Sequence, residues 1–254
     1  MLENRVRNKE LRERIISADE AAMFFKTGMN VGTSGFTPAG YPKAVPLVLA
    51  KRVEKGDQIE IVLMTGASVG DELDGALSRA GIIKRRYPYQ TNKDLRNSIN
   101  KGDIEFDDIH LSEFPQWVKY GFVGKIDIAL VEAIAITEEG NIVPSTSVGN
   151  TNVYVENADK VIVEINLNQP LELEGIHDIY SPLNPPNRRV ISIYNVGDKI
   201  GTSYIPCDPD KIVGIVITDI KDSPNKLAVV DDVSAKMAEN LFGFLENEIK
   251  HGRI

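Results

Sequence analysis

Cysteine and histidine are scarce in this sequence of 254 residues, and their scarcity limits its chemistry. Cys207 is the one cysteine, so the chain can form neither a disulfide framework nor a cysteine-rich metal site. The three histidines, His110, His177 and His251, are far apart and match no spacing typical of zinc ligands. We therefore expect no metal site.

An excess of basic residues and a long apolar run are also missing. The net charge is −8, and an acidic surface repels both nucleic acid and anionic membranes. No apolar stretch approaches the roughly 18 residues of a membrane-spanning helix, and residues 1–15 are too charged for a signal peptide. We expect a cytoplasmic protein that binds neither nucleic acid nor membrane. The net negative charge is nevertheless compatible with a local basic pocket for an anionic ligand.

Several familiar catalytic motifs are missing as well. The sequence contains no G-x-S-x-G nucleophile elbow, no G-K-[ST] phosphate loop and no G-x-G-x-x-G dinucleotide fingerprint. A serine hydrolase of that type, a Walker-type nucleotide hydrolase and a Rossmann dehydrogenase are therefore disfavoured.

The most informative stretch is 29–50, which is typical of a strand, a glycine-rich loop and a helix. Gly32, Gly35 and Gly40 lie in or next to this loop. The free N–H groups at the start of the following helix favour a carboxylate, a phosphate or a developing oxyanion. A tight turn that binds no ligand is the alternative, and the pattern leaves both open.

Two further loops of small residues, 65–70 and 145–152, also follow predicted strands. Alternating strands and helices predict an α/β fold with an open, mostly parallel sheet and helices on both faces. Ligands bind such sheets beyond the carboxyl ends of the strands, so we expect the three loops to meet in one crevice. Besides the short strand that begins at Val31, the predicted strands are 59–64, 107–111, 126–133, 161–166 and 212–218, and a hairpin turn at 138–141 is predicted between AIAIT (133–137) and IVPST (142–146). The predicted helices are 17–26, 43–50, 72–80, 92–100 and 233–250. Residues 168–210 are rich in proline and are predicted to be irregular.

A few charged residues each have two interpretations. Glu132 and Glu164 lie in apolar strands and are either reactive carboxylates or, as we favour, strand residues with a buried partner. Arg85 and Arg86 either face an anion or, as we favour, form a solvated surface. His177 belongs to an acid/base cluster or, preferably, to a structural loop.

Six long blocks, in order along nearly the whole chain, resemble the acetyl-CoA hydrolase/CoA-transferase family, and most of all its succinyl-CoA:acetate CoA-transferase branch (class I CoA-transferases). The blocks are GTSGFTPAGYPKAVP (32–46), MTGASVGDELDGAL (64–77), RRYPYQTNKDLRNSIN (85–100), VEAIAITEEGNIVPSTSVGN (131–150), ADKVIVEIN (158–166) and LEGIHDIY (173–180).

The resemblance implies a two-domain α/β enzyme, usually a homodimer, that transfers CoA from a short acyl-CoA such as acetyl- or succinyl-CoA to a free carboxylate such as acetate. A glutamate attacks the thioester in ping-pong steps, and coenzyme A is a substrate, so no bound cofactor is expected. By motif match, Gly35, Phe36, Gly66, Ser68 and Thr91 are expected to line the small-carboxylate pocket.

In the family, the nucleophilic glutamate belongs to a C-terminal domain that follows a helix like 233–250. None of Glu132, Glu164 and Glu174 matches its motif. Residues 1–254 are therefore expected to form the N-terminal domain, inactive alone, whose partner is a C-terminal CoA-transferase domain or subunit.

Substrate choice is left open by the sequence. The family tends to place an arginine that grips a carboxylate near 217–226, where this chain offers Lys221 or Lys226. An acetyl-CoA hydrolase of the same family is the alternative enzyme. A non-catalytic module that binds a sugar phosphate or a carboxylate is the alternative outside enzymes.

Overall fold

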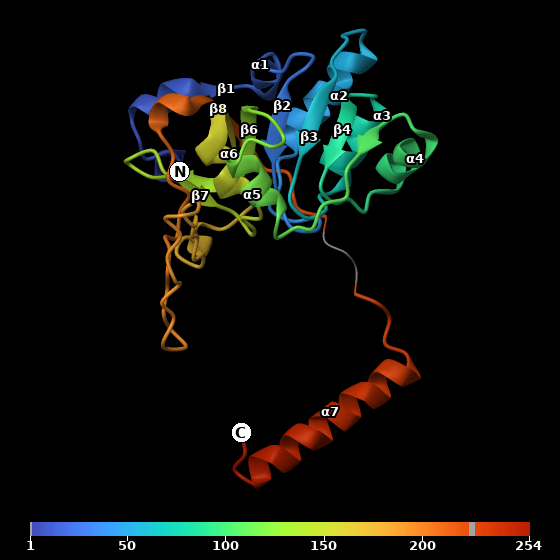
Figure 1. Ribbon diagram of the computed structural model, residues 1–254, viewed down its shortest axis with the longest axis vertical. Coiled ribbons are helices and arrows are strands. Elements are labelled where there is room, and N and C mark those ends of the chain that lie inside the picture. The colour runs from blue at the N-terminus through green and yellow to red at the C-terminus, as the bar shows by residue number, and fades with distance from the viewer. Residues whose placement is uncertain (1, 224–226) are drawn as a thin grey trace. The chain divides into compact units, whose positions relative to one another are not determined.

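The computed structural model describes residues 2–223 and 227–254, which belong to two compact units, Met1–Pro224 and Asn225–Ile254. The first unit contains a nine-stranded sheet (Figure 1) in the order β1-β9-β8-β6-β2-β3-β4-β5, with β7 beside β6. The strand pairs are parallel except β6 with β7. The strands are β1 (Ile15–Ile16), β2 (Asn30–Thr33), β3 (Ile61–Met64), β4 (Ile83–Tyr87), β5 (Glu105–Phe106), β6 (Ile126–Ile136), β7 (Ile142–Pro144), β8 (Ala158–Asn166) and β9 (Ile212–Thr218).

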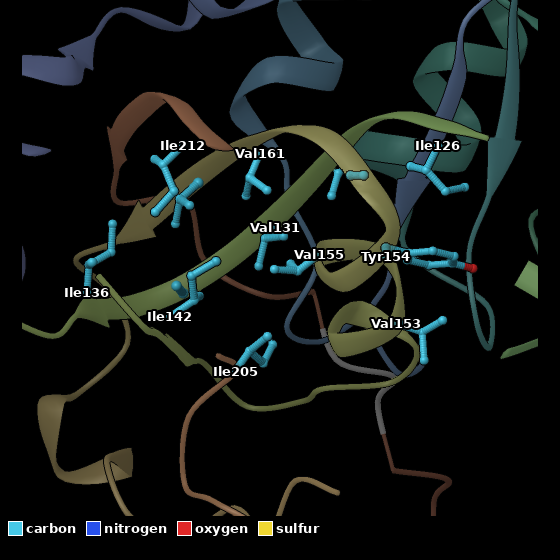
Figure 2. Packing of buried hydrophobic residues seen from close by; sticks show 14 of the residues in the cluster. Ile126, Val131, Ile136, Ile142, Val153, Tyr154, Val155, Val161, Ile205 and Ile212 are labelled. Carbon is cyan, nitrogen blue, oxygen red and sulfur yellow. The ribbon is translucent and has the colours of Figure 1, made fainter. Parts of the chain in front are cut away.

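Helices pack on both faces of this sheet, which confirms the predicted fold class. The helices of the first unit are α1 (Ala18–Ala22), α2 (Ala44–Glu54), α3 (Ala76–Arg79), α4 (Lys93–Lys101), α5 (Phe114–Lys119) and α6 (Thr151–Asn157). Helices α1 to α4 bury apolar side chains against one face, and α5, α6 and the N-terminal residues cover the other. Figure 2 shows the second face, where Val155 of α6 lies beside Val131 of β6.

The central strands are apolar on both faces because helices cover both, as is usual for parallel sheets. Strand β8 is fully buried from Val161 onward, and β9 begins and ends at the predicted residues. The long apolar runs in the sequence therefore predicted the inner strands at the right places in the chain.

Local start and stop signals mostly act as predicted. The Ser17 hydroxyl accepts from the Glu20 N–H at 3.1 Å, and the Glu20 carboxylate accepts from the Ser17 N–H at 2.8 Å, so the capping box at the start of α1 is present. The helix ends at Ala22 rather than near residue 26, and Gly28 follows with a φ of +89°.

Near one edge of the sheet, one strand was missed and another was predicted at the wrong residues. Strand β4 was missed because its sequence, Ile83–Tyr87, carries three adjacent cations. The edge strand β5 lies at Glu105–Phe106 and not at 107–111. The predicted helix at 72–80 divides into a π-helical turn, Asp71–Gly75, followed by α3.

Within the Asn225–Ile254 unit, α7 (Asp232–Lys250) is the predicted amphipathic helix. Its large apolar side chains are exposed, among them Met237, Leu241 and Phe244. Over the described residues, none of the helices is both long and apolar enough to cross a membrane.

Candidate functional site

The three small-residue loops meet beyond the carboxyl ends of the strands, as predicted. The Asn150 N–H donates to the Ser34 hydroxyl at 3.0 Å, and the Ser147 hydroxyl donates to the Ala39 carbonyl at 3.2 Å. A Cβ added to Gly66 would lie 2.8 Å from the Ser34 Oγ. Glycine and serine are needed here because larger side chains would force the loops apart.

Tyr41 connects the first loop to the second. Its ring is fully buried, and its hydroxyl donates to a Glu72 carboxylate oxygen at 2.5 Å. A Cβ on Gly70 would lie 1.9 Å from the Tyr41 hydroxyl oxygen. Burial, together with Glu72, raises the pKa of Tyr41, so the phenol stays a donor and fixes the distance between the two loops.

A buried ion cluster underlies the same loops. The Lys43 ammonium group contacts Glu132 at 2.5 Å, Asp222 at 2.8 Å and the Tyr41 carbonyl at 2.8 Å. Burial alone would lower the pKa of Lys43, but Glu132 and Asp222 outweigh it and raise that pKa. Burial raises the pKa of Glu132, and Lys43 opposes this rise. The Ser145 hydroxyl also donates to Glu132, at 2.7 Å.

Asp222 connects the cluster to two of the loops. It accepts from the Gly40 N–H at 3.3 Å, from the Thr146 hydroxyl at 3.3 Å and from the Gln169 amide at 2.9 Å. One carboxylate thus holds the loop after β2 beside the loop after β7. Charge and hydrogen bonds, as well as packing, therefore determine the shape of the crevice.

The N-terminus of α2 is already filled by a carboxylate of the chain. Glu164 is fully buried on β8 and accepts from the backbone N–H groups of Lys43, Ala44 and Val45 at 2.8, 3.0 and 2.7 Å. Burial raises the pKa of Glu164, and these three donors oppose the rise. The sequence left open whether this helix end binds an anionic ligand or forms a turn without one. The helix end does hold a carboxylate, but it is the side chain of Glu164 from the same chain.

Glu132 and Glu164 are register partners on neighbouring strands, and both have buried partners. The favoured interpretation of these two residues is confirmed. Sequence reasoning could not identify the partners, because Lys43 lies far from both in the chain and no periodic pattern connects them.

The favoured interpretation of Arg86 was wrong. Arg86 is fully buried and forms a two-fold ion pair with Asp74, with both N···O distances 3.0 Å, and it also donates to the Tyr87 carbonyl. Burial raises the pKa of Asp74, and Arg86 opposes the rise. Arg85, on the opposite side of β4, lies at the surface and pairs with Glu105.

The predicted pocket residues have different environments. Gly35, Gly66 and Ser68 are buried in the converging loops, whereas Phe36 is 63% exposed at the tip of the first loop. Thr91 is exposed after β4, and the next residue, Asn92, donates to Asp71 just beyond the second loop. The structure thus brings the first three into one loop cluster. The role of all five as ligand contacts stays a prediction.

His177 lies beside the third loop and has a structural contact. Its Nε2 is 2.7 Å from the Ser145 carbonyl, so Nε2 carries the proton. A hollow of about 240 Å³ lies here, between Gly149, Asn152 and Tyr180 among others. A larger hollow of about 620 Å³ borders the amino ends of β3 to β5, away from the loops.

Other candidate groups do not join the crevice. Lys221 is exposed, and Lys226 lies outside the described residues. Over 2–223 and 227–254, no group of three or more histidine, cysteine or carboxylate side chains is placed to hold a metal ion.

Comparison with known proteins gives consistent matches. Residues 1–217 match the family model "Acetyl-CoA hydrolase/transferase N-terminal domain". The chain is 51% identical to a succinyl-CoA:acetate CoA-transferase of Clostridium kluyveri over 99% of its own length and 47% of that protein. It is 41% identical to an acetyl-CoA hydrolase of Saccharomyces cerevisiae over 100% of its length and 50% of that protein. The chain thus spans about half the length of these relatives.

Solved structures share the fold. RipA from Yersinia pestis superposes with a TM-score of 0.61 at 15% identity, covering 87% of this chain and 46% of that one. Glutaconate coenzyme A-transferase from Acidaminococcus fermentans gives 0.54 at 11% identity, covering 81% and 76%.

Proposed function

The chain belongs to the acetyl-CoA hydrolase/transferase family, and from this premise we propose that it is the N-terminal domain of a CoA-transferase. The complete enzyme would move CoA between a short acyl-CoA and a free carboxylate such as acetate. The observation that carries the proposal is the meeting of three small-residue loops at the carboxyl ends of the strands. Their backbones approach closely enough to form a wall for a small ligand.

The reaction needs a glutamate that we assign to a C-terminal domain or subunit. That glutamate attacks the thioester carbonyl, CoA thiolate leaves, and an acyl-glutamyl anhydride forms. The thiolate then attacks the glutamyl carbonyl, which releases the carboxylate and leaves a glutamyl-CoA thioester. A second carboxylate reverses these steps. No catalytic residue is assigned to this chain.

In this scheme the chain contributes the small-carboxylate pocket. Gly35, Gly66 and Ser68 would form its inner wall, with Phe36 and Thr91 at the entrance, in keeping with their exposure. The Ser68 hydroxyl would orient the carboxylate by donating a hydrogen bond. The site would operate in the cytoplasm.

The test is transfer of CoA from succinyl-CoA to acetate. The chain alone should give no turnover, and adding the C-terminal half of the Clostridium kluyveri relative should restore it. Substantial turnover by the chain alone would contradict the assignment of the nucleophile. In the restored system, Ser68→Ala should raise KM for acetate about tenfold, the value of one lost hydrogen bond to a charged group. Ser112→Ala, at an exposed site, is the matched control.

An acetyl-CoA hydrolase is the second candidate, because the Saccharomyces cerevisiae relative carries that name. Release of free CoA without any carboxylate acceptor, by the restored system, would favour it. Binding of a sugar phosphate by the chain, with no binding of acetate, would instead favour a non-catalytic module.

A further inference from the structure

The buried side chain of Arg86 uses three of its nitrogen atoms at once. Arg86 lies on β4 beside Leu63 of β3 and is fully buried. Its Nε and Nη2 donate to the two carboxylate oxygens of Asp74, and its Nη1 donates to the Tyr87 carbonyl. The planar guanidinium fixes the directions of these donors, which a lysine ammonium does not. Arg86 therefore links two segments rigidly, the turn that carries Asp74 and the end of β4.

Through Asp74, Arg86 is connected to the end of the second loop, 65–70. Asp74 lies in the π-helical turn that follows this loop directly, and its N–H donates to the Gly70 carbonyl at 3.1 Å. Burial raises the pKa of Asp74, whereas Arg86 and the backbone N–H of Val69 lower it. The carboxylate thus interacts with the backbone next to Ser68, and the ion pair fixes this end of the loop.

Through Tyr87, Arg86 is connected to the beginning of the same loop. The Tyr87 carbonyl accepts from the Thr65 N–H at 3.0 Å as well as from Arg86. The Thr65 carbonyl in turn accepts from the Tyr154 hydroxyl, and from the Asn150 amide at 3.5 Å. Arg86 therefore holds both ends of the second loop, and the first of these ends is also joined to the third loop.

Residues 87–92 are attached to the π-helical turn at both of their ends. Arg86 connects the first of these residues to Asp74. At the other end, the side-chain amide of Asn92 donates to Asp71 at 3.0 Å. Because the turn follows the second loop directly, residues 87–92 and that loop are held together by one buried link and one exposed link.

We propose that Arg86 is a positioning residue that holds Ser68 and Thr91 at the separation at which both hydroxyls bind one carboxylate. The inference rests on the proposed function, in which these two residues line the small-carboxylate pocket. Arg86 is fully buried, so it acts through the backbone of the two segments and not on the substrate. Losing its fixed geometry should weaken binding of the carboxylate, because orientation of a bound group depends on donors held in place.

The variant Arg86→Lys tests this role with the charge retained. A buried lysine is able to pair with a carboxylate in this chain, as Lys43 does with Glu132. An ammonium group at position 86 cannot bind Asp74 through two nitrogens and also reach the Tyr87 carbonyl. The ion pair is therefore kept, and the rigid link between the two segments is lost.

Two further variants accompany it. Arg14→Lys is the matched control, because the Arg14 guanidinium also donates to two backbone carbonyls, at 2.8 and 2.7 Å, but at the beginning of β9. Asn92→Ser removes only the exposed link to Asp71 and keeps a side-chain oxygen that caps α4. Circular dichroism shows whether each variant is folded, and Asn92→Ser carries the test if Arg86→Lys is not.

Amide hydrogen exchange of the chain alone measures the positioning directly. In Arg86→Lys, the amide protons of Thr65 and Val69 should exchange about tenfold faster, because local opening of the second loop then breaks fewer hydrogen bonds. In Arg14→Lys, the same protons should keep their wild-type exchange rates.

The restored system, in which this chain is combined with the C-terminal half of the Clostridium kluyveri relative, measures the consequence. Arg86→Lys should raise KM for acetate about tenfold and Asn92→Ser about threefold, with kcat within about twofold of wild type. In the Arg86→Lys background, Ser68→Ala should raise KM by less than about twofold, because the hydroxyl is already displaced. A merely structural defect would lower kcat through loss of folded enzyme and would leave KM unchanged.

Three results would overturn the proposal: unchanged exchange rates in folded Arg86→Lys, an unchanged KM for acetate in the folded variants, or the full effect of Ser68→Ala in the Arg86→Lys background. Absence of turnover by the wild-type restored system would instead contradict the proposed function. The exchange rates would then decide alone whether Arg86 holds the two segments, so the two failures are distinguishable.

Discussion

Replacing Lys43 by methionine should expose how strongly the buried ion cluster holds the crevice together. The side chains of Lys43 and Glu132 are fully buried, and that of Asp222 is 13% exposed. Methionine fills similar space but leaves Glu132 charged without its cation. Removing one partner of a buried ion pair costs about 3–5 kcal/mol in the free energy of unfolding. At about 2–4 °C per kcal/mol, the melting temperature should fall by roughly 6–20 °C.

The loss should depend on pH in a defined direction. Burial already raises the pKa of Glu132, and removing Lys43 raises it further. Between the unfolded pKa, about 4.3, and the folded pKa, the native state then binds a proton that the unfolded state does not, so stability rises as pH falls. The defect should therefore be largest near pH 8 and smaller near pH 5. In the wild type, the raised pKa of Lys43 keeps its contribution intact below about pH 10.

Urea unfolding followed by circular dichroism at pH 8 and pH 5 measures both effects. The double variant Lys43→Met/Glu132→Met should be more stable than Lys43→Met at pH 8, because it removes the fully buried uncompensated carboxylate and leaves only Asp222, which is partly exposed. Lys26→Met, at an exposed position, is the control and should stay within about 0.5 kcal/mol of wild type. A loss below about 1 kcal/mol at pH 8, with no change at pH 5, would refute the reasoning, since such a value is typical of surface pairs.

Three further changes test other parts of the fold by the same unfolding measurement. Arg86→Met should cost about 3–5 kcal/mol because it leaves the buried carboxylate of Asp74 without its cation, whereas Arg85→Met, at a partly exposed site, should cost under about 1 kcal/mol. Gly70→Ala should lose about 1–3 kcal/mol because its Cβ would lie 1.9 Å from a tyrosine hydroxyl, while Gly243→Ala, in open space on α7, should raise helix stability by up to about 1 kcal/mol. Ser17→Ala should cost about 1 kcal/mol through the lost capping box. Equal costs within either matched pair, or no cost for Ser17→Ala, would contradict these assignments.

The inner part of the sheet was predictable because burial on both faces produces long apolar runs. Strands β8 and β9 were predicted from such runs alone. Strand β4 was not, since IKRRY looks like a solvated segment. One of its arginines is buried only because Asp74, twelve residues earlier, pairs with it across the layer between sheet and helix. Such a pairing is a tertiary contact, and the spacing of hydrophobic residues in the sequence does not predict it.

The position of the candidate site was predictable for a different reason. Two of the three small-residue loops follow the parallel strands β2 and β3, whose carboxyl ends lie at one edge of the sheet. The third loop follows β7, which runs antiparallel to the last residues of β6 and so leads residues 145–152 back toward the other two loops. The side chains that hold the loops together, above all Asp222 and Lys43, were not predictable, because these two residues are far apart in the sequence and meet only in the folded chain. The five residues assigned to the pocket rest on family resemblance, and their contacts with a ligand stay a prediction.

Glu164 changes what the first loop can offer a substrate. The start of α2 combines a partial positive charge with three free N–H groups, and Glu164 satisfies all three from β8. A ligand would have to displace a fully buried carboxylate to use them, and that carboxylate would lose every one of these donors. In the proposed enzyme, the anionic groups of an acyl-CoA or an acetate must therefore be held by other donors. Ser68 and Thr91 offer hydroxyls on this chain, and the remaining positive charge would come from the C-terminal half.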